Sequence, residues 1–196
     1  MGVRNSLYNF LMGKVIAGIT MSLDGFVQDE RGSVAELYSD FGELHDVASF
    51  HETIRNTGAV VMGKRAFEMG EPDSYAGIYE FQVPIFVLTH AVPQRHPLET
   101  GALTFTFVTD GIESAMAQAQ KAAGAQDIQL VGGASAIQQC LNAGLCDELH
   151  IDVMPVLLGE GLRLFENIAT DEVKLEKIGV EESTSARTSM RFRVVR

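Results

Sequence analysis

Short apolar runs recur along the chain and are separated by polar or amphipathic stretches. The first run, residues 15–20, is rich in β-branched side chains and predicts a buried strand. Runs of the same kind predict further strands at residues 59–62, 84–88, 103–108 and 128–131. A series of short buried strands is typical of a sheet that is covered on both faces.

The stretches between these runs have the composition and the end signals of helices. We expect helices at residues 43–55, 64–69, 113–123 and 134–143. Thr109 and Asp110 precede the third helix and are expected to cap its N-terminus. Glycines follow three of the helices and are expected to end them, at Gly58, Gly124 and Gly144.

The last third of the chain predicts strands of a different kind. Residues 149–154 alternate apolar and polar side chains, which indicates a strand with two unlike faces. Residues 174–180 and 187–195 predict an antiparallel closing hairpin. Because the earlier strands alternate with helices, we predict an α/β fold with three layers (α/β/α). Its central sheet is expected to be mixed and mostly parallel, with the antiparallel hairpin at its C-terminal end.

The composition is that of one globular domain. The chain has 196 residues, of which 46% are hydrophobic and 21% charged. A formal net charge of −11 argues against nucleic acid or an anionic membrane as a partner. No apolar run reaches the length of a membrane span. We interpret residues 1–13 as an N-terminal extension that makes a poor signal peptide, and residues 14–196 as the domain.

The two cysteines bear on the compartment in which the protein works. Cys140 and Cys146 are six residues apart, and the chain has no Cys-x-x-Cys motif. Neither a zinc site nor a disulfide framework is therefore expected, and no other cluster of metal-ligating residues stands out. A reducing cytoplasm fits this usage best.

The most informative local feature is a turn between a strand and a helix. Val131 ends an apolar strand, Gly132 and Gly133 follow, and Ala134 and Ser135 open the next helix. Glycines let a ligand approach the backbone, and the first N–H groups of a helix favour an anion such as a pyrophosphate. A tight turn in which glycine serves only packing is the alternative, and the turn alone does not decide between the two.

Two other strand ends carry polar residues suited to a nucleotide. Gly63, Lys64 and Arg65 follow one strand, and two adjacent cations in an acidic protein suit a phosphate. The alternative is that both cations only solvate the first turn of a helix. Thr89 and His90 follow another strand, where a hydroxyl and an imidazole would meet an adenosine ribose or its phosphate unless they belong to a plain loop.

Candidates for acid chemistry are few. Asp46 is expected in the early part of the helix at residues 43–55, beside an apolar face that includes Phe50. A carboxylate there would protonate a substrate during hydride transfer, or it would only favour the helix dipole. Ser22 and Asp24 lie in a Ser-Leu-Asp-Gly turn, where Asp24 either holds backbone N–H groups or faces the ligand.

In their order along the chain, these segments resemble the dihydrofolate-reductase-like family. The resemblance is greatest to the branch that contains the C-terminal reductase domain of riboflavin biosynthesis, and it extends over residues 14–196. The segments that carry it are residues 22–25, 61–65, 130–133, 144–151 and 154–161, with Leu164 and Phe165.

The resemblance implies an NADPH-dependent reductase with a heterocyclic substrate, such as 5-amino-6-(5-phosphoribosylamino)uracil. Ala17 and Thr20 would lie near the nicotinamide and residues 131–135 along the pyrophosphate. Residues 63–65 would lie near the adenosine-side phosphates and Thr89 near the 2′-phosphate, with His90 as a further cofactor contact. Asp46 would be the catalytic acid, and Ser22, Asp24 and Phe50 would contact the substrate. A homodimer through residues 154–158 is also implied.

Some residues depart from the family pattern. The chain has no tryptophan, whereas dihydrofolate reductases usually carry one after the first strand. Phe26 follows the Ser-Leu-Asp-Gly turn, where the riboflavin-pathway reductases commonly have a lysine. The first departure argues against dihydrofolate as the substrate, and the second argues against a phosphorylated ribose substrate of the riboflavin pathway. The alternative functions are activity of the dihydrofolate reductase type and a nucleotide-binding module without catalysis.

Overall fold

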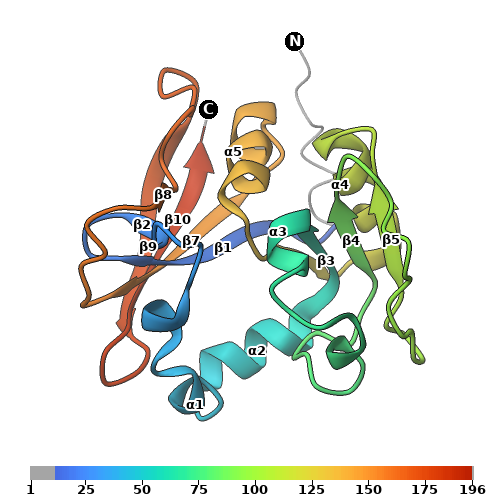
Figure 1. The fold of residues 1–196 in the computed structure, drawn as a ribbon. Helices are drawn as coiled ribbons and strands as arrows, with labels where there is room; N and C mark the ends of the chain where they lie inside the picture. The colour runs from blue at the N-terminus through green and yellow to red at the C-terminus, as the bar shows by residue number, and fades with distance from the viewer. Residues whose placement is uncertain (1–11, 196) are drawn as a thin grey trace.

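The computed structural model describes residues 12–195, which form a single eight-stranded sheet with helices on both faces (Figure 1). The strand order is β5-β4-β3-β6-β1-β7-β10-β9. The pairs from β5 to β7 are parallel, whereas β10 is antiparallel to both β7 and β9. The predicted fold class is confirmed. Most of the predicted extension at residues 1–13 lies outside the described residues.

The strands begin and end close to the predicted positions. They are β1 (Val15–Ser22), β2 (Phe26–Gln28), β3 (Thr57–Gly63), β4 (Ile85–Leu88), β5 (Phe105–Val108), β6 (Asp127–Leu130), β7 (Glu148–Met154), β8 (Leu162–Arg163), β9 (Lys174–Glu182) and β10 (Thr188–Val195). The short strands β2 and β8 pair with each other as a separate ribbon that the sequence did not predict. The closing hairpin β9–β10 is confirmed.

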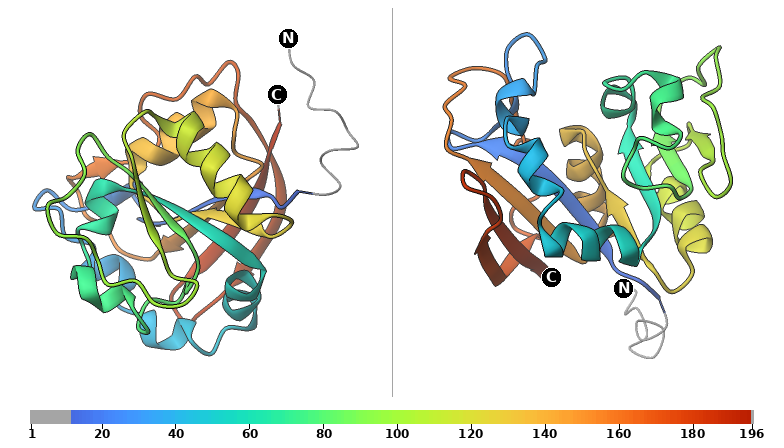
Figure 2. Two further views of the ribbon diagram at one scale, coloured as in Figure 1. Left: turned by 90° about the vertical axis from the view of Figure 1, so that its right-hand side faces the viewer. Right: turned by 90° about the horizontal axis from the view of Figure 1, so that it is seen from below.

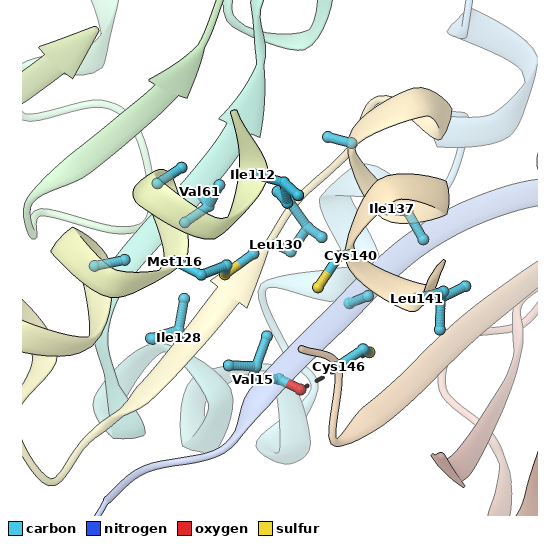
Figure 3. Packing of buried hydrophobic residues seen from close by; sticks show 14 of the residues in the cluster. Val15, Val61, Ile112, Met116, Ile128, Leu130, Ile137, Cys140, Leu141 and Cys146 are labelled. Atoms are coloured by element: carbon cyan, nitrogen blue, oxygen red, sulfur yellow. Dashed lines mark hydrogen bonds between the residues drawn. The ribbon is translucent and has the colours of Figure 1, made fainter. Parts of the chain in front are cut away.

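The helices form two layers. They are α1 (Phe41–Leu44), α2 (Ala48–Asn56), α3 (Lys64–Phe67), α4 (Ile112–Ala123) and α5 (Ala134–Ala143), with 3-10 turns η1 (Ala35–Tyr38) and η2 (Pro72–Tyr75). Helices α4 and α5 cover one face of the sheet, and α2 crosses the other (Figures 1 and 2). The larger core lies under α4 and α5, where side chains such as Met116, Ile137 and Leu130 are buried (Figure 3).

Three helix predictions are wrong in detail. Gly58 does not end a helix, because α2 ends at Asn56 and Gly58 lies in β3. The helix expected at residues 43–55 is broken, because the backbone leaves the helical conformation at Val47, whose ψ is 120°. Thr109 and Asp110 do not cap α4. Its N-cap is Gly111, at a φ of 104°, with no side-chain hydrogen bond to the helix end. Gly124 and Gly144 do follow α4 and α5 at positive φ, as predicted.

Two further findings concern partners. Within residues 12–195, no helix has both the length and the apolar character that crossing a membrane requires. Met154, at the start of the segment expected to form a dimer surface, is completely buried, so its side chain is not part of a surface. Leu157 in the same segment is 73% exposed. The homodimer stays a prediction.

Candidate functional site

A cavity of about 1280 Å³ crosses the sheet on the face that α2 covers. At one end it is lined by residues that follow β3, β4 and β6, among them Gly63, His90 and Gly133. At the other end it is lined by side chains of β1, β7, β9 and β10 and by residues of η1, α1 and α2. We call these the glycine end and the hairpin end. A volume of this size suits a dinucleotide together with a small ring compound.

The glycine end is built around the Gly132–Gly133 turn. Gly132 has a φ of 96°, and its carbonyl accepts a 2.9 Å hydrogen bond from the Gly63 N–H, which joins this turn to the end of β3. Helix α5 begins directly after Gly133 without a side-chain cap. Within the described chain, the N–H groups of Ala134 and Ser135 have no hydrogen-bond acceptor. They are free to bind an anion.

Two glycines leave open space where a ligand would lie. A Cβ atom added to Gly18 or to Gly133 would meet no atom within 4 Å, and both residues line the cavity. Thr20, two residues after Gly18, also lines it. Ala17 was predicted beside the nicotinamide, but its side chain is fully buried in the core under α4 and α5 and does not line the cavity. The reason is the alternation of a strand, which points Ala17 away from Gly18.

The predicted cations also lie at the glycine end. Lys64 and Arg65 are exposed and line the cavity. Lys64 forms an ion pair with Glu68, with an N–O distance of 3.4 Å, whereas Arg65 has no ion pair or hydrogen bond to any of residues 12–195. Arg65 therefore keeps its charge and its donors available for a ligand.

Thr89 and His90 lie at the same end but differ in their freedom. Thr89 is buried, and its hydroxyl donates to the carbonyl of Ala91 at 2.9 Å and accepts from the Ala91 N–H at 3.3 Å. Both bonds of this hydroxyl therefore stabilise the turn at residues 89–91. His90 is exposed beside the cavity.

Asp46, the predicted acid, is not where the prediction put it. It lies between α1 and α2 rather than in the first turns of a helix, and it is exposed. It does not line the cavity, whereas its neighbours His45 and Val47 do. The break before α2 causes this, because it turns the Asp46 side chain away from the apolar face that Phe50 presents to the cavity. The structure offers no support for Asp46 as the acid.

Ser22 and Asp24 also fall outside the cavity lining. The Ser22 hydroxyl donates to the Asp24 carboxylate at 2.6 Å, and that carboxylate accepts the N–H groups of Leu158 and Gly159. The Ser22 hydroxyl bond and these N–H groups lower the pKa of Asp24 to about 2. Of the two readings of this turn, the structure favours the one in which Asp24 holds backbone N–H groups.

The hairpin end contains a network that the sequence did not reveal. Arg187, which is 1% exposed, lies just before β10. Its guanidinium donates to both carboxylate oxygens of Asp40, at 2.6 and 2.9 Å. It also donates to the Thr20 hydroxyl at 2.6 Å and to Asp152 at 3.0 Å. Burial acts to raise the pKa of Asp40, but hydrogen bonds from Arg187 and Thr184 outweigh it and lower that pKa below its ordinary value.

Asp152 is the carboxylate of this network that lines the cavity, together with Thr20 and Arg187. Its side chain is 32% exposed, one oxygen accepts from Arg187, and the other accepts from the Ser189 hydroxyl. Tyr38 lines the cavity nearby, and its ring centroid lies 5.6 Å from the Arg187 Cζ atom. Desolvation raises the pKa of the Tyr38 phenol above its ordinary value.

The alternating pattern of residues 149–154 is one sequence signal for the hairpin end. The polar positions of the alternating segment 149–154 are His150 and Asp152, and both line the cavity, whereas Leu149 and Ile151 are buried in the core. His150 bonds to Glu148 at 3.0 Å. That bond and the ion pair with Lys14 lower the pKa of Glu148 to about 2. The sequence pattern therefore indicated the polar face of β7 as part of the site. No sequence pattern indicated Asp40 or Arg187.

The sequence matches the family model of the RibD C-terminal domain over residues 13–187. The chain belongs to this family. The Bacillus subtilis protein YyaP, whose function is uncharacterised, is 25% identical in an alignment of 174 residues, and the match covers 82% of this chain and 84% of YyaP.

Solved structures of related fold include two reductases. A diaminohydroxyphosphoribosylaminopyrimidine deaminase/5-amino-6-(5-phosphoribosylamino)uracil reductase from Thermotoga maritima has a TM-score of 0.65 at 14% identity, and the match covers 94% of this chain and 57% of that one. Dihydrofolate reductase from Enterococcus faecalis, in complex with NADP(H), has a TM-score of 0.58 at 18% identity, covering 94% and 98%. At these identities the likeness shows a fold shared by riboflavin-pathway and dihydrofolate reductases.

Proposed function

We propose that this RibD-family protein is an NADPH-dependent reductase of a heterocyclic substrate. The observation that carries the proposal is the glycine end of the cavity. Gly18 and Gly133 leave space there, the N–H groups of Ala134 and Ser135 are without acceptors, and Arg65 is without an ion pair. The Thermotoga and Enterococcus relatives are named as a reductase and as an NADP(H) complex, which supports the same assignment.

These residues fit the chemical groups of NADPH. The Ala134 and Ser135 N–H groups would bind the pyrophosphate, because they combine hydrogen-bond donors with the positive end of the α5 dipole. Arg65, with His90 beside it, would bind the 2′-phosphate, and the open surface over Gly18 would accept the nicotinamide ring. When bound, NADPH supplies the hydride, and the chain contributes orientation and the exclusion of water.

The substrate would then lie at the hairpin end, beside Thr20, Phe50 and Asp152. Phe50 from α2 gives this end an apolar wall, and Asp152 and Thr20 give it a polar floor. The proton that accompanies the hydride would come from water or from the Tyr38 phenol, which keeps its proton at neutral pH.

A fluorescence titration with NADPH tests the cofactor assignment. We expect saturable binding, and we expect Gly133→Ala to weaken it roughly tenfold or more, because a methyl group would occupy the space left for the pyrophosphate. The backbone of Gly133, at φ −69° and ψ 173°, is open to alanine, so the thermal stability of the variant should not change.

The matched control is Gly42→Ala, a substitution in exposed α1 where an added Cβ atom would also meet nothing. It should bind NADPH as the unaltered protein does. Absence of NADPH binding at millimolar concentration would overturn the proposal. Binding without turnover of any heterocycle would instead favour a nucleotide-binding module.

A further inference from the structure

The two ends of the cavity differ in the charge that they offer to a ligand. At the glycine end, the cations Lys64 and Arg65 are exposed, and Arg65 is without an ion pair in the described chain. At the hairpin end, both arginines that line the cavity are paired with carboxylates, and the imidazole of His150 bonds to Glu148. The substrate would bind at the second end.

Arg187 has no donor left for a ligand. A guanidinium has five N–H groups. Those of Arg187 are used by two bonds to Asp40, one to Asp152, one to the Thr20 hydroxyl and one to the Leu37 carbonyl at 3.1 Å. With 1% of its side chain exposed, Arg187 fixes the position of Asp152 and is unable to turn toward a phosphate.

Arg191 is the other arginine of this end, and its charge is offset by Glu181. The two side chains form an ion pair, and both line the cavity. Ser49 of α2 donates to the same Glu181 oxygen at 3.0 Å, which holds the carboxylate in place. At the cavity surface of the hairpin end, the carboxylates of Asp152 and Glu181 are thus paired with the two guanidinium groups, and Asp40 lies buried behind Arg187. A dianionic phosphate would meet no unpaired guanidinium there.

Asp152 is suited to the opposite kind of ligand. A carboxylate accepts about four hydrogen bonds, and Asp152 receives one from Arg187 and one from Ser189, so acceptor positions remain on the exposed part of the side chain. Because those two bonds fix its orientation, it presents a preorganised acceptor to the cavity. Ring N–H and amino groups are the donors that such an acceptor binds strongly.

We propose that the substrate is a nitrogen heterocycle without a phosphate group, and that Asp152 recognises the ring through its N–H donors. This inference rests on the proposed reductase function and specifies its substrate class. It separates this chain from the Thermotoga protein, which is named as the reductase of a phosphoribosylamino compound. Arg187 is a positioning residue for Asp152.

Two ligands that share a ring test the inference directly. Isothermal titration of the full chain, with and without NADPH, would compare 5,6-diaminouracil with 5-amino-6-(5-phosphoribosylamino)uracil. We expect the unphosphorylated ring to bind roughly tenfold tighter or more, since the phosphate finds no free cation at the hairpin end. Equal or tighter binding of the phosphoribosyl compound would overturn the inference, and so would the failure of both rings to bind at millimolar concentration.

A variant tests the role of Asp152. Asp152→Asn should weaken 5,6-diaminouracil roughly tenfold or more, because a charge-assisted hydrogen bond becomes a neutral one. Asp171→Asn, at an exposed position away from the cavity, is the matched control and should bind as the unaltered protein does. Unchanged binding in folded Asp152→Asn would contradict the assignment. If that variant does not fold, the comparison of the two ligands on the unaltered protein still tests whether the substrate lacks a phosphate group.

The NADPH titration separates the two failures. Loss of NADPH binding with normal binding of 5,6-diaminouracil would remove the reductase proposal and leave the ligand specificity. Normal NADPH binding with preference for the phosphoribosyl compound would remove only the specificity.

Discussion

The two ends of the cavity are built in different ways. The glycine end consists of short continuous segments, residues 63–65, 89–90 and 131–135, with exposed cations in the first of them. The hairpin end consists of single residues from distant parts of the chain. Arg187 reaches Asp40 across 147 positions and Thr20 across 167. One end is a local motif, and the other is a tertiary network.

This difference also separates the forces at the two ends. Exposed cations at the glycine end are weakly coupled to the fold, so their removal should change ligand binding more than stability. The buried ions at the hairpin end are coupled to the fold, because each leaves an uncompensated charge when its partner is removed. The comparison predicts large effects on folding at one end and moderate effects on affinity at both.

The largest expected effect is that of Arg187→Ala. The Asp40 side chain is 2% exposed and would be left as a buried carboxylate without its cation. We expect a loss of about 3–5 kcal/mol in the free energy of unfolding, measured by urea denaturation. The control is Arg193→Ala, whose partner Glu176 lies 3.4 Å away with both side chains 58% exposed, and which should cost less than about 1 kcal/mol. Equal losses would show that the buried network contributes no more to the free energy of unfolding than an exposed ion pair does.

The pH dependence of the same pair sharpens this test. The pKa of Asp40 is held below 3.8 in the folded protein, so its stabilising contribution is full above that pH and is lost as the pH falls. Without Arg187, burial raises the pKa of Asp40, so the variant takes up a proton there at a higher pH than the unaltered protein does. The deficit of Arg187→Ala should therefore narrow as the pH falls, beginning above 3.8. A deficit that does not change with pH would mean that Arg187 acts only through packing.

A moderate effect is expected for Arg65→Ala at the glycine end. Removing a guanidinium from the 2′-phosphate should raise the Kd of NADPH about tenfold and change that of NADH much less. Lys64→Ala should act more weakly, because Lys64 is already paired with Glu68. Fluorescence titrations with both nucleotides measure the ratio of the Kd for NADPH to the Kd for NADH. The same loss for NADH as for NADPH would argue that Arg65 does not bind the 2′-phosphate.

The smallest effect is expected for Glu181→Gln at the hairpin end. This change releases Arg191 from its carboxylate and makes a cation available where there is none. Binding of 5-amino-6-(5-phosphoribosylamino)uracil should tighten about threefold, since the two side chains are 35% and 41% exposed and surface charge pairs are weak. Binding of 5,6-diaminouracil should stay the same. Weaker binding of the phosphoribosyl compound would contradict the charge argument.

The sequence predicts most of the fold, because its strands and helices alternate with clear boundaries. The Gly132–Gly133 turn was also predictable as a strand-to-helix junction, since two adjacent glycines after an apolar run indicate such a turn. The break before α2 was not. It depends on the extended conformation of Val47, for which no proline or glycine gives a signal in the sequence.

The residues of the candidate site also fall into those that local sequence motifs predict and those that they do not. Gly63, Arg65 and Ser135 line the cavity where local motifs predicted them. Asp46 was misplaced because the expected helix is interrupted at Val47, which leaves Asp46 between α1 and α2 instead of on a helix face. Arg187 was missed because an isolated arginine before a hairpin strand shows nothing of the buried carboxylate that it meets in the folded chain.

The span between Asp40 and Arg187 has a consequence during protein synthesis. A ribosome adds about 5–20 residues per second, so the 147 positions between them take roughly 7–30 s to make. For that time Asp40 is without its cation. The chain through α5 is complete before residue 187 is added. A nascent chain that stops before residue 187 would therefore contain every residue of the glycine end, and its hairpin end would lack the guanidinium that holds it together.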